Sequence, residues 1–377
     1  MNFDPGTLLL VAAFILFLLG GLMFLAAFQG RREPTLWWVG ASMWLSCSAF
    51  LLGITRQHPE YLAFSIIVTN TLLILSHACL WTGLRLFRGH KVLWPVLLAG
   101  PAIWPVLGLW PVFMQEVDLR VAVYSVLCLV YLLAAIREIW PEWREHQSAI
   151  SPLLGFLVLH ALFYAYRIPP RTFQDHVWAN WPEFALVMFE GIFFVVGLSY
   201  SVLMAVRARA EDNYRYAALH DVLTTLPNRR ALFHQGAVLL QEASAHHADI
   251  AALMCDLDHF KLINDRFGHE TGDQVLIRFA RVLREVVGDE GFYARLGGEE
   301  FVVLVPHTGR LGAEQWAQKI RSGLAACSAQ LPSPLTVSVG IACASGMPVS
   351  LDRLLAQADQ AMYLAKAAGR DCIRVWP

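Results

Sequence analysis

The hydrophobic residues are concentrated in the first half of the chain, where long apolar runs alternate with short polar breaks as far as about Val206. A helix that crosses a bilayer needs roughly 20 mostly apolar residues, and most of these runs reach or approach that length. The pattern predicts seven membrane spans, at residues 7–28, 36–54, 61–84, 92–113, 121–136, 152–166 and 182–206. The fourth contains prolines that would kink it, and the sixth is short.

The Lys and Arg residues of the short loops predict the orientation of these spans, because such residues accumulate on the cytoplasmic side. One set of loops, with the residues after the last span, carries Arg31, Arg32, Arg85, Arg88, Lys91, Arg137, Arg144, Arg207 and Arg209. The alternate set carries Arg56, Arg120, Arg167 and Arg171. The N-terminus is therefore expected outside and the C-terminal domain in the cytoplasm, in agreement with an odd number of spans.

Some polar residues fall inside predicted spans, among them Asn70, His77, His160 and Glu190. Polar residues in a membrane either form a functional site or hydrogen-bond between helices. We favour interhelical hydrogen bonds, because nothing in the sequence pairs these four residues. Glu190 is the one to test first, since a carboxylate is the costliest of the four to bury.

The second half has an ordinary globular pattern. Residues 207–219 contain no proline or glycine and are predicted to continue the last span as a helical linker. Helices are then expected at 229–245, 274–287, 312–327 and 351–368, and strands at 250–255, 335–343 and 373–376, with a hairpin around Gly297 and Gly298. The predicted domains are a membrane domain at 1–206, the linker at 207–219 and a cytoplasmic domain at 220–377.

Composition adds three limits. A hydrophobic content of 56% is too high for an ordinary soluble protein. The net charge is −1, and no basic tail or run points to nucleic acid. The seven cysteines have no CxxC spacing, so we expect reduced thiols, with neither a disulfide framework nor a zinc site.

The candidate chemistry lies around two acidic stretches. Two glycines predict a tight hairpin turn, which presents Glu299 and Glu300 at its tip. A predicted buried strand ends in Asp256 and Asp258, which resemble half of a metal cradle. Adjacent acids suit a hard cation such as Mg²⁺, which in turn brings a phosphate.

Further polar residues follow the buried strand. Lys261 can bind a phosphate as a point charge. Asn264 and Asp273 offer the donors and acceptors that a guanine edge needs. Lys366 and Arg370 are spaced four apart at the end of the last helix, so both can point to the same side.

Taken together, these segments resemble the GGDEF family of diguanylate cyclases. The resemblance covers about Leu219 to Trp376. It rests on six motifs in order: DxLTxLPNR (Asp221–Arg229), DxDxFKxxND (Asp256–Asp265), FGHxxGD (Phe267–Asp273), RxGGEEF (Arg295–Phe301), TxSxGIA (Thr336–Ala342) and AKxxGR (Ala365–Arg370).

The resemblance implies an α/β domain with a nucleotide-cyclase-like or palm-like sheet and flanking helices, which follows an α-helical membrane domain. Two such domains face each other in a homodimer, and each holds one GTP. The 3′-hydroxyl of each GTP attacks the α-phosphorus of the other, which gives cyclic di-GMP and pyrophosphate. The location implied is the bacterial inner membrane, with the lipid bilayer and an unknown sensory ligand as further partners.

By motif position, the resemblance assigns a Mg²⁺ site (or Mn²⁺) to Asp256, the Leu257 carbonyl and Glu299. Glu299 would also help to deprotonate the hydroxyl, with Glu300 beside it, and Lys261 joins them as a catalytic residue. Asn264 and Asp273 would bind guanine. The remaining residues assigned to GTP are Lys261, Lys366, Arg370, Gly298 and the backbone amides of His259 and Phe260.

One departure from the family concerns the RxxD site for product inhibition, which lies just before the glycine pair. Gly288 and Gly291 occupy its two positions here, so we expect weak or no feedback at that site. Two alternatives to an active cyclase are a degenerate domain that acts as a nucleotide receptor, and a transporter or channel with a regulatory tail. The intact acids and Lys261 oppose the first alternative, and scarce charge within the spans opposes the second.

Overall fold

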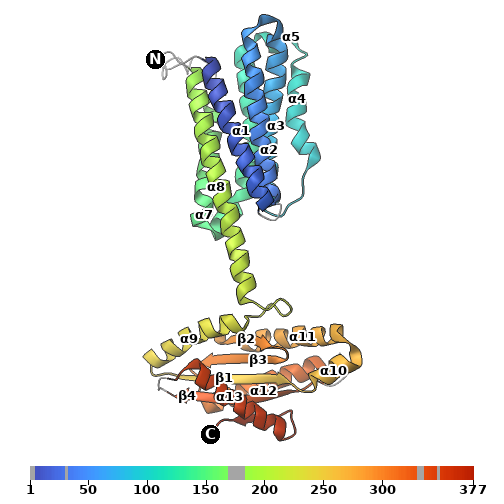
Figure 1. Ribbon diagram of the computed structural model, residues 1–377, viewed down its shortest axis with the longest axis vertical. Coiled ribbons are helices and arrows are strands. Elements are labelled where there is room, and N and C mark those ends of the chain that lie inside the picture. The colour runs from blue at the N-terminus through green and yellow to red at the C-terminus, as the bar shows by residue number, and fades with distance from the viewer. Residues whose placement is uncertain (1–4, 30–32, 169–182, 329–334, 346–348) are drawn as a thin grey trace. The chain divides into compact units, whose positions relative to one another are not determined.

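The computed structural model describes residues 5–29, 33–168, 183–328, 335–345 and 349–377. The chain divides into two compact units, Met1–Ala210 and Glu211–Pro377 (Figure 1). Helix α8 (Glu183–Leu219) runs without a break from the first unit into the second, as expected for residues 207–219. The predicted domain boundaries themselves remain predictions.

The first unit is a helical bundle. Its helices are α1 (Pro5–Gln29), α2 (Pro34–Gly53), α3 (Leu62–Phe87), α4 (Trp94–Leu107), α5 (Pro111–Gln115), α6 (Val117–Glu145), α7 (Gln147–Tyr166) and the first part of α8, with two short 3₁₀ turns, η1 (Ile54–Gln57) and η2 (Pro59–Tyr61). Among the described residues, six helices are long and apolar enough to cross a membrane. Helix α4, where the fourth span is predicted, has only 14 residues. The structure therefore leaves the count of seven spans as a prediction.

Two ion pairs show that α3 and α6 run in the same direction along the bundle. Arg85 and Arg88, at the end of α3, pair with Glu138 and Glu142, in the last turns of α6. Helices α3 and α6 therefore finish at the same end of the bundle, called here the Arg85 end. In the sequence, α4 and α5 connect the end of α3 to the start of α6. This segment must therefore return to the opposite end of the bundle, which is called here the Arg120 end.

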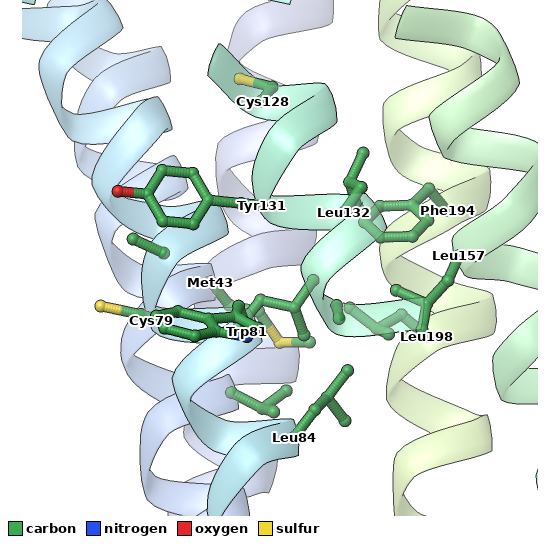
Figure 2. Packing of buried hydrophobic residues seen from close by; sticks show 14 of the residues in the cluster. Met43, Cys79, Trp81, Leu84, Cys128, Tyr131, Leu132, Leu157, Phe194 and Leu198 are labelled. Atoms are coloured by element: carbon green, nitrogen blue, oxygen red, sulfur yellow. The ribbon is translucent and has the colours of Figure 1, made fainter. Parts of the chain in front are cut away.

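Apolar side chains from all the long helices fill the interior of this unit. Figure 2 shows buried residues of α2, α3, α6, α7 and α8 that meet between the helices, among them Trp81, Leu132 and Phe194. The outward faces carry large exposed apolar residues such as Phe14, Leu18 and Phe193. An apolar surface of this kind is stable in contact with lipid and not in contact with water.

The second unit is built on a five-stranded mixed sheet in the order β2-β3-β1-β4-β5. Its strands are β1 (Asp249–Leu257), β2 (Phe292–Gly297), β3 (Glu300–Pro306), β4 (Val337–Ser345) and β5 (Ile373–Val375). Strands β1 to β4 pair antiparallel, and β5 is parallel to β4. The predicted strands and the hairpin are confirmed.

Helices cover both faces of the sheet. They are α9 (Arg229–Ala245), α10 (Phe260–Phe267), α11 (His269–Val287), α12 (Arg310–Ser328) and α13 (Leu351–Ala367). Odd-numbered residues of β1, such as Leu253, pack with α10, α11 and α12, and even-numbered residues, such as Met254, pack with α9 and α13. The sequence did not predict α10. Asn228 caps α9 as expected, since its side chain accepts a hydrogen bond from the Ala231 amide.

Candidate functional site

The two acidic stretches lie opposite each other on neighbouring strands. In the register of β1 with β3, Asp256 pairs with Glu300. The amide of the next residue, Leu257, donates a hydrogen bond of 3.3 Å to the Glu299 carbonyl. Antiparallel pairing thus brings together residues that are far apart in the sequence. The acids predicted to share one site do lie at one place in the fold.

The hairpin between β2 and β3 depends on its two glycines. Gly297 has φ 156° and Gly298 has φ 49°, backbone conformations that side chains disfavour. The Arg295 guanidinium holds the turn closed, because its Nε and Nη2 donate to the Gly298 carbonyl at 3.1 and 2.6 Å. The carboxylates that follow therefore extend from a fixed backbone.

Asp256 is the most buried acid of this site, with 3% of its surface exposed. It is an even-numbered residue of β1, so its side chain faces α13, and Lys366 in the last turn of α13 meets it. Lys366 Nζ lies 2.6 Å from Asp256 Oδ2. The other oxygen, Oδ1, is buried and has no hydrogen-bond partner among the residues described. A buried oxygen without a donor is costly, so this atom points to a ligand outside the chain.

The acids of the site repel one another. Burial, followed by the charge of Asp256, raises the pKa of Glu299 above its ordinary value. The same two causes raise the pKa of Glu300. Burial also raises the pKa of Asp256, although the hydrogen bond and charge of Lys366 act against it. A bound cation would relieve this crowding of negative charge.

Asp258, which the sequence predicted to form half of a metal cradle with Asp256, has a structural role. Its two carboxylate oxygens accept hydrogen bonds from the hydroxyls of Thr336 and Ser338, both at 2.7 Å, and from the Asp371 amide at 3.0 Å. These bonds tie β1 to β4 and to the turn after α13. These three bonds occupy most of the acceptor sites of the Asp258 carboxylate, so Asp258 is a poorer cation ligand than Asp256, whose Oδ1 has no partner among the described residues.

Asn264 and Asp273 come from two helices that meet at a sharp turn. Gly268 lies between α10 and α11 with φ 83°, and its amide donates to the Asn264 carbonyl at 2.9 Å. Gly272 packs so closely on the Asn264 side chain that a Cβ at residue 272 would collide with Asn264 Oδ1. The FGHxxGD motif thus places Asn264 beside the residue that precedes Asp273.

The start of α10 supplies the predicted backbone amides. His259 adopts a left-handed conformation (φ 59°) just before the first residue of the helix, Phe260. The first N–H groups of an α-helix have no partner within the helix, and they favour anions. Lys261 is exposed one residue further on, and no ion pair among the described residues joins it to Asp256.

Arg370 differs from expectation. Helix α13 ends at Ala367, so Arg370 lies beyond it, in a left-handed conformation (φ 66°), and does not share a helix face with Lys366. The cause is Gly369 (φ 112°), which turns the chain after the helix. The charge of Arg370 nevertheless acts on the Asp256 carboxylate.

The sequence reasoning missed the role of the first motif. Asp221 Oδ1 accepts a hydrogen bond from Arg295 Nη1 at 2.8 Å, while the amide and hydroxyl of Thr224 donate to the same oxygen. Burial opposes ionisation of Asp221, but these bonds outweigh it and hold the pKa of Asp221 below its ordinary value. The sequence shows a conspicuous Asp before a turn-rich segment. It does not show that the partner of this Asp lies 74 residues away.

The residues present fit a divalent cation. Among the described residues, no three His, Cys, Asp or Glu side chains come together as a complete metal site. The proposed set is different, since it has the Asp256 and Glu299 carboxylates and one backbone carbonyl. The unpartnered Asp256 Oδ1 and the raised pKa values are what such a set requires before a cation binds.

A mixed sheet with acids at a glycine turn, cations close by and a helix N-terminus after the central strand is typical of a domain that binds a metal ion and phosphates. Residues 218–372 match the family model described as "Diguanylate cyclase, GGDEF domain". This part of the chain therefore forms a GGDEF domain.

Individual relatives agree with the family model. The diguanylate cyclase DgcP of Pseudomonas aeruginosa is 42% identical over 170 residues, which make up 44% of this chain and 25% of that protein. The diguanylate cyclase DgcM of Escherichia coli is 39% identical over 163 residues, 43% of this chain and 40% of that protein. The chain thus spans less than half the length of either relative.

Among solved structures, the chain is similar to the coiled coil and GGDEF domain of DgcB from Caulobacter crescentus, determined in complex with c-di-GMP. The sequence identity is 30% and the TM-score is 0.44, with 47% of this chain and 96% of that chain covered.

Proposed function

We propose that the chain is a membrane-bound diguanylate cyclase, which condenses two GTP into cyclic di-GMP and releases two pyrophosphates. The observation that carries the proposal is the pairing of Asp256 with Glu300 across β1 and β3, next to the buried, unpartnered Asp256 Oδ1. The curated relatives with diguanylate cyclase activity in their names support it.

The residues of this chain divide the work as follows. Asn264 and Asp273 bind the guanine edge, because a mismatched base would leave their polar groups unpaired. Lys366, Arg370, Lys261 and the first amides of α10 bind the phosphates. Gly298 lets the nucleotide approach the turn closely, because it has no side chain.

The reaction consists of two attacks of one GTP on the other, and each of them forms one P–O bond and breaks another. The 3′-oxygen of one GTP bonds to the α-phosphorus of the other, the bond from that phosphorus to the bridging oxygen breaks, and pyrophosphate leaves. Glu299, with Glu300 beside it, takes the proton of the 3′-hydroxyl; the raised pKa values of both acids favour this role. Because each GTP attacks the other, two GGDEF domains must face each other in a dimer.

A divalent cation, Mg²⁺ or Mn²⁺, would be held by Asp256, the Leu257 carbonyl and Glu299. When bound, it lowers the pKa of the attacking hydroxyl and neutralises charge on the phosphates.

Feedback by product is expected to be weak, because the RxxD positions are Gly288 and Gly291. Two backbone features support this reading. Gly288 has φ 51°, which disfavours an arginine. A Cβ at residue 291 would lie 2.8 Å from the Leu304 carbonyl oxygen, which is too close for an aspartate without a shift of β3.

We propose seven passes through the inner membrane, with the N-terminus outside and the GGDEF domain in the cytoplasm. The return of the chain between α3 and α6 supports a crossing by α4 and α5. The Arg85 end also carries Lys91, Arg137, Arg144, Arg207 and Arg209, as a cytoplasmic end should. Arg31, Arg32 and Arg171 lie outside the described residues, so this argument rests on the others.

A chain of contacts within the second unit supports regulation through α8. Asn228 Nδ2 donates to the carbonyls of Ala218, in the last turn of α8, and of His220. Asp221, the residue after His220, accepts a hydrogen bond from Arg295. Arg295 in turn donates to the Gly298 carbonyl at the acidic turn. Movement of the end of α8 therefore reaches the catalytic glutamates through two hydrogen-bonded steps.

The test is turnover of GTP by membranes that contain the full chain, with Mg²⁺ and with EDTA. We expect cyclic di-GMP from the native chain and none from Glu299→Gln, whose neutral amide cannot accept the hydroxyl proton. GTP binding without product in the native chain would instead favour a nucleotide receptor. Glu290→Gln, an exposed acid outside the site, is the matched control.

A further inference from the structure

The first unit, Met1–Ala210, contains a cavity of about 710 Å³, within the range of ligand pockets, which is roughly 300–1,000 Å³. Most of its lining is apolar and comes from α1, α2, α3, α6, α7 and α8. The Arg, His and Glu side chains of its lining form two groups. Arg56, Arg120 and Arg167 lie at the Arg120 end, and His77, His160 and Glu190 lie deeper, with His160 about 10 Å along α7 from Arg167.

The three arginines have no acidic partner in the part of the chain that the structure describes. Arg56 donates to Thr69 and Asn70, which are neutral, and Arg167 lies over the rings of Phe163 and Tyr164. None of the ion pairs among the described residues includes Arg56, Arg120 or Arg167. Guanidinium groups around an apolar membrane cavity are costly unless an anion pairs with them.

The deeper group does not supply that anion. His160 Nδ1 lies 2.6 Å from Glu190 Oε1, and the Nε2 atoms of His77 and His160 lie 3.4 Å apart. The centroids of the two imidazole rings are 5.6 Å apart, whereas their Nε2 atoms are only 3.4 Å apart. The two rings therefore lie edge to edge, with both Nε2 atoms on the line that joins the ring centres.

The hydrogen bonds of these rings determine the charge of the group. His77 Nδ1 faces the Leu73 carbonyl at 2.8 Å, which can only accept, so this nitrogen carries a hydrogen. With His77 neutral, the bond between the rings needs a hydrogen on His160 Nε2. Glu190 and His160 Nδ1 then share one further proton. Whichever atom holds it, the Glu190–His160 pair is neutral overall, so it adds no net negative charge to balance the arginines among the residues that the structure describes.

The positions of the same arginines are opposite to those that the positive-inside rule favours. They lie at the Arg120 end, where positive residues weaken the positive-inside signal. Three cations that line one cavity at the end where cations are disfavoured point to a ligand that requires them.

We infer that this cavity binds an amphipathic organic anion: a carboxylate or phosphate head held by Arg120 and Arg167, and an apolar body that extends toward His77 and His160. The planar fork of each guanidinium matches such a head, and the apolar lining matches the body. The ligand enters from the Arg120 end. This site gives the proposed sensory ligand a chemical class, but ligand binding does not depend on cyclase activity.

The experiment is equilibrium dialysis of radiolabelled octanoate against the full chain in phosphatidylcholine nanodiscs, with empty nanodiscs subtracted. We expect saturable binding of one octanoate per chain, and no competition by 1-octanol or acetate, which lack the head or the body. Arg120→Gln and Arg167→Gln should each weaken binding about tenfold or more. Arg120→Lys, which keeps the charge, should lose less. Arg137→Gln, an exposed cation at the Arg85 end, is the matched control and should bind as the native chain does.

The anionic head has two sources, a free organic acid or a lipid headgroup. Nanodiscs with added phosphatidylglycerol separate them: octanoate affinity is unchanged if the ligand is a free acid and falls if the lipid head occupies the site. Both results support an anion site. Equal binding by 1-octanol, or unchanged binding by both glutamine variants, overturns the inference. GTP turnover in the same nanodiscs reports separately on the proposed cyclase.

Discussion

Lys366 Nζ lies 2.6 Å from Asp256 Oδ2, so the last turn of α13 neutralises a carboxylate at the end of β1. Only one oxygen of Asp256 is used in this pair, and the other is buried without a partner among the described residues. The Asp256 side chain is 4% exposed and that of Lys366 is 30% exposed, so removing Lys366 leaves a buried acid without its counter-charge. Lys366 therefore stabilises the ionised acid, and we propose that it also provides a cation for a phosphate.

Lys366→Met tests both roles. We expect GTP turnover to fall at least tenfold and the KM for GTP to rise, because the acid loses its partner and the phosphates lose a cation. Kinetics of the full chain at saturating Mg²⁺ measure both values. Lys319→Met is the matched control: Lys319 lies over the Trp316 ring, 4.6 Å from its centroid, and its loss should leave turnover unchanged. Equal effects of the two variants would contradict a role for Lys366.

The raised pKa values of Asp256, Glu299 and Glu300 give a dependence on pH with a definite sign. Each folded-state pKa lies above that of the unfolded chain. Without a cation, the contribution of these acids to stability is greatest below the ordinary carboxylate pKa of about 4 and declines as the pH rises through the raised values. Bound Mg²⁺ needs the ionised forms, so the rise in Tm caused by Mg²⁺ should grow over that same pH interval.

Thermal unfolding of the full chain with and without Mg²⁺, repeated across pH, measures this growth. Glu299→Gln should flatten it, since one titrating ligand is gone. Asp289→Asn, an exposed acid of the turn after α11, should not. An effect of Mg²⁺ that is the same at every pH would show that these acids do not hold the ion.

The sequence predicted much of this site because each motif is continuous along the chain. The strand that ends in Asp256 and the glycine turn before Glu299 follow from local patterns, and antiparallel pairing alone joins them. What it did not predict depends on distant contacts. The engagement of Asp258 by Thr336 and Ser338, and that of Asp221 by Arg295, join separate segments. No local pattern encodes those partners.

In the first unit, too, the sequence predicted the local features but not the contacts between helices. Length and hydropathy found the long helices, and the interhelical hydrogen bonds expected for polar residues are confirmed for His77, His160 and Glu190. The edge-to-edge pairing of the histidines depends on how α3 and α7 pack, which hydropathy does not determine. The short α10 was missed because polar and charged residues fill most of its exposed face, next to the strand-end acids that dominate the pattern.

Arg295→Ala should loosen the acidic turn from two sides, because the side chain bonds both the Gly298 carbonyl and Asp221. We expect a loss of about 1–3 kcal/mol in stability, as for hydrogen bonds to charged groups. Turnover should fall about tenfold or more, since Glu299 follows the turn. Arg310→Ala removes an exposed pair with Glu314 and should cost about 0.5 kcal/mol or less, with unchanged turnover. Denaturant unfolding and GTP kinetics of the two variants make the comparison.

Gly272→Ala tests the proposed binding of guanine by Asn264 separately from the chemistry. Alanine normally stabilises a helix interior relative to glycine by up to about 1 kcal/mol. At residue 272 its Cβ would collide with Asn264 Oδ1, so the Asn264 side chain must move from its present position. We expect the KM for GTP to rise about tenfold, the preference for GTP over ATP to shrink, and kcat to change little, because the acids lie on other elements. Gly312→Ala, in α12, is the matched control, since the nearest atom to its Cβ is the Thr308 methyl at 3.0 Å. A KM for GTP that stays unchanged in Gly272→Ala would mean that Asn264 does not contact the base.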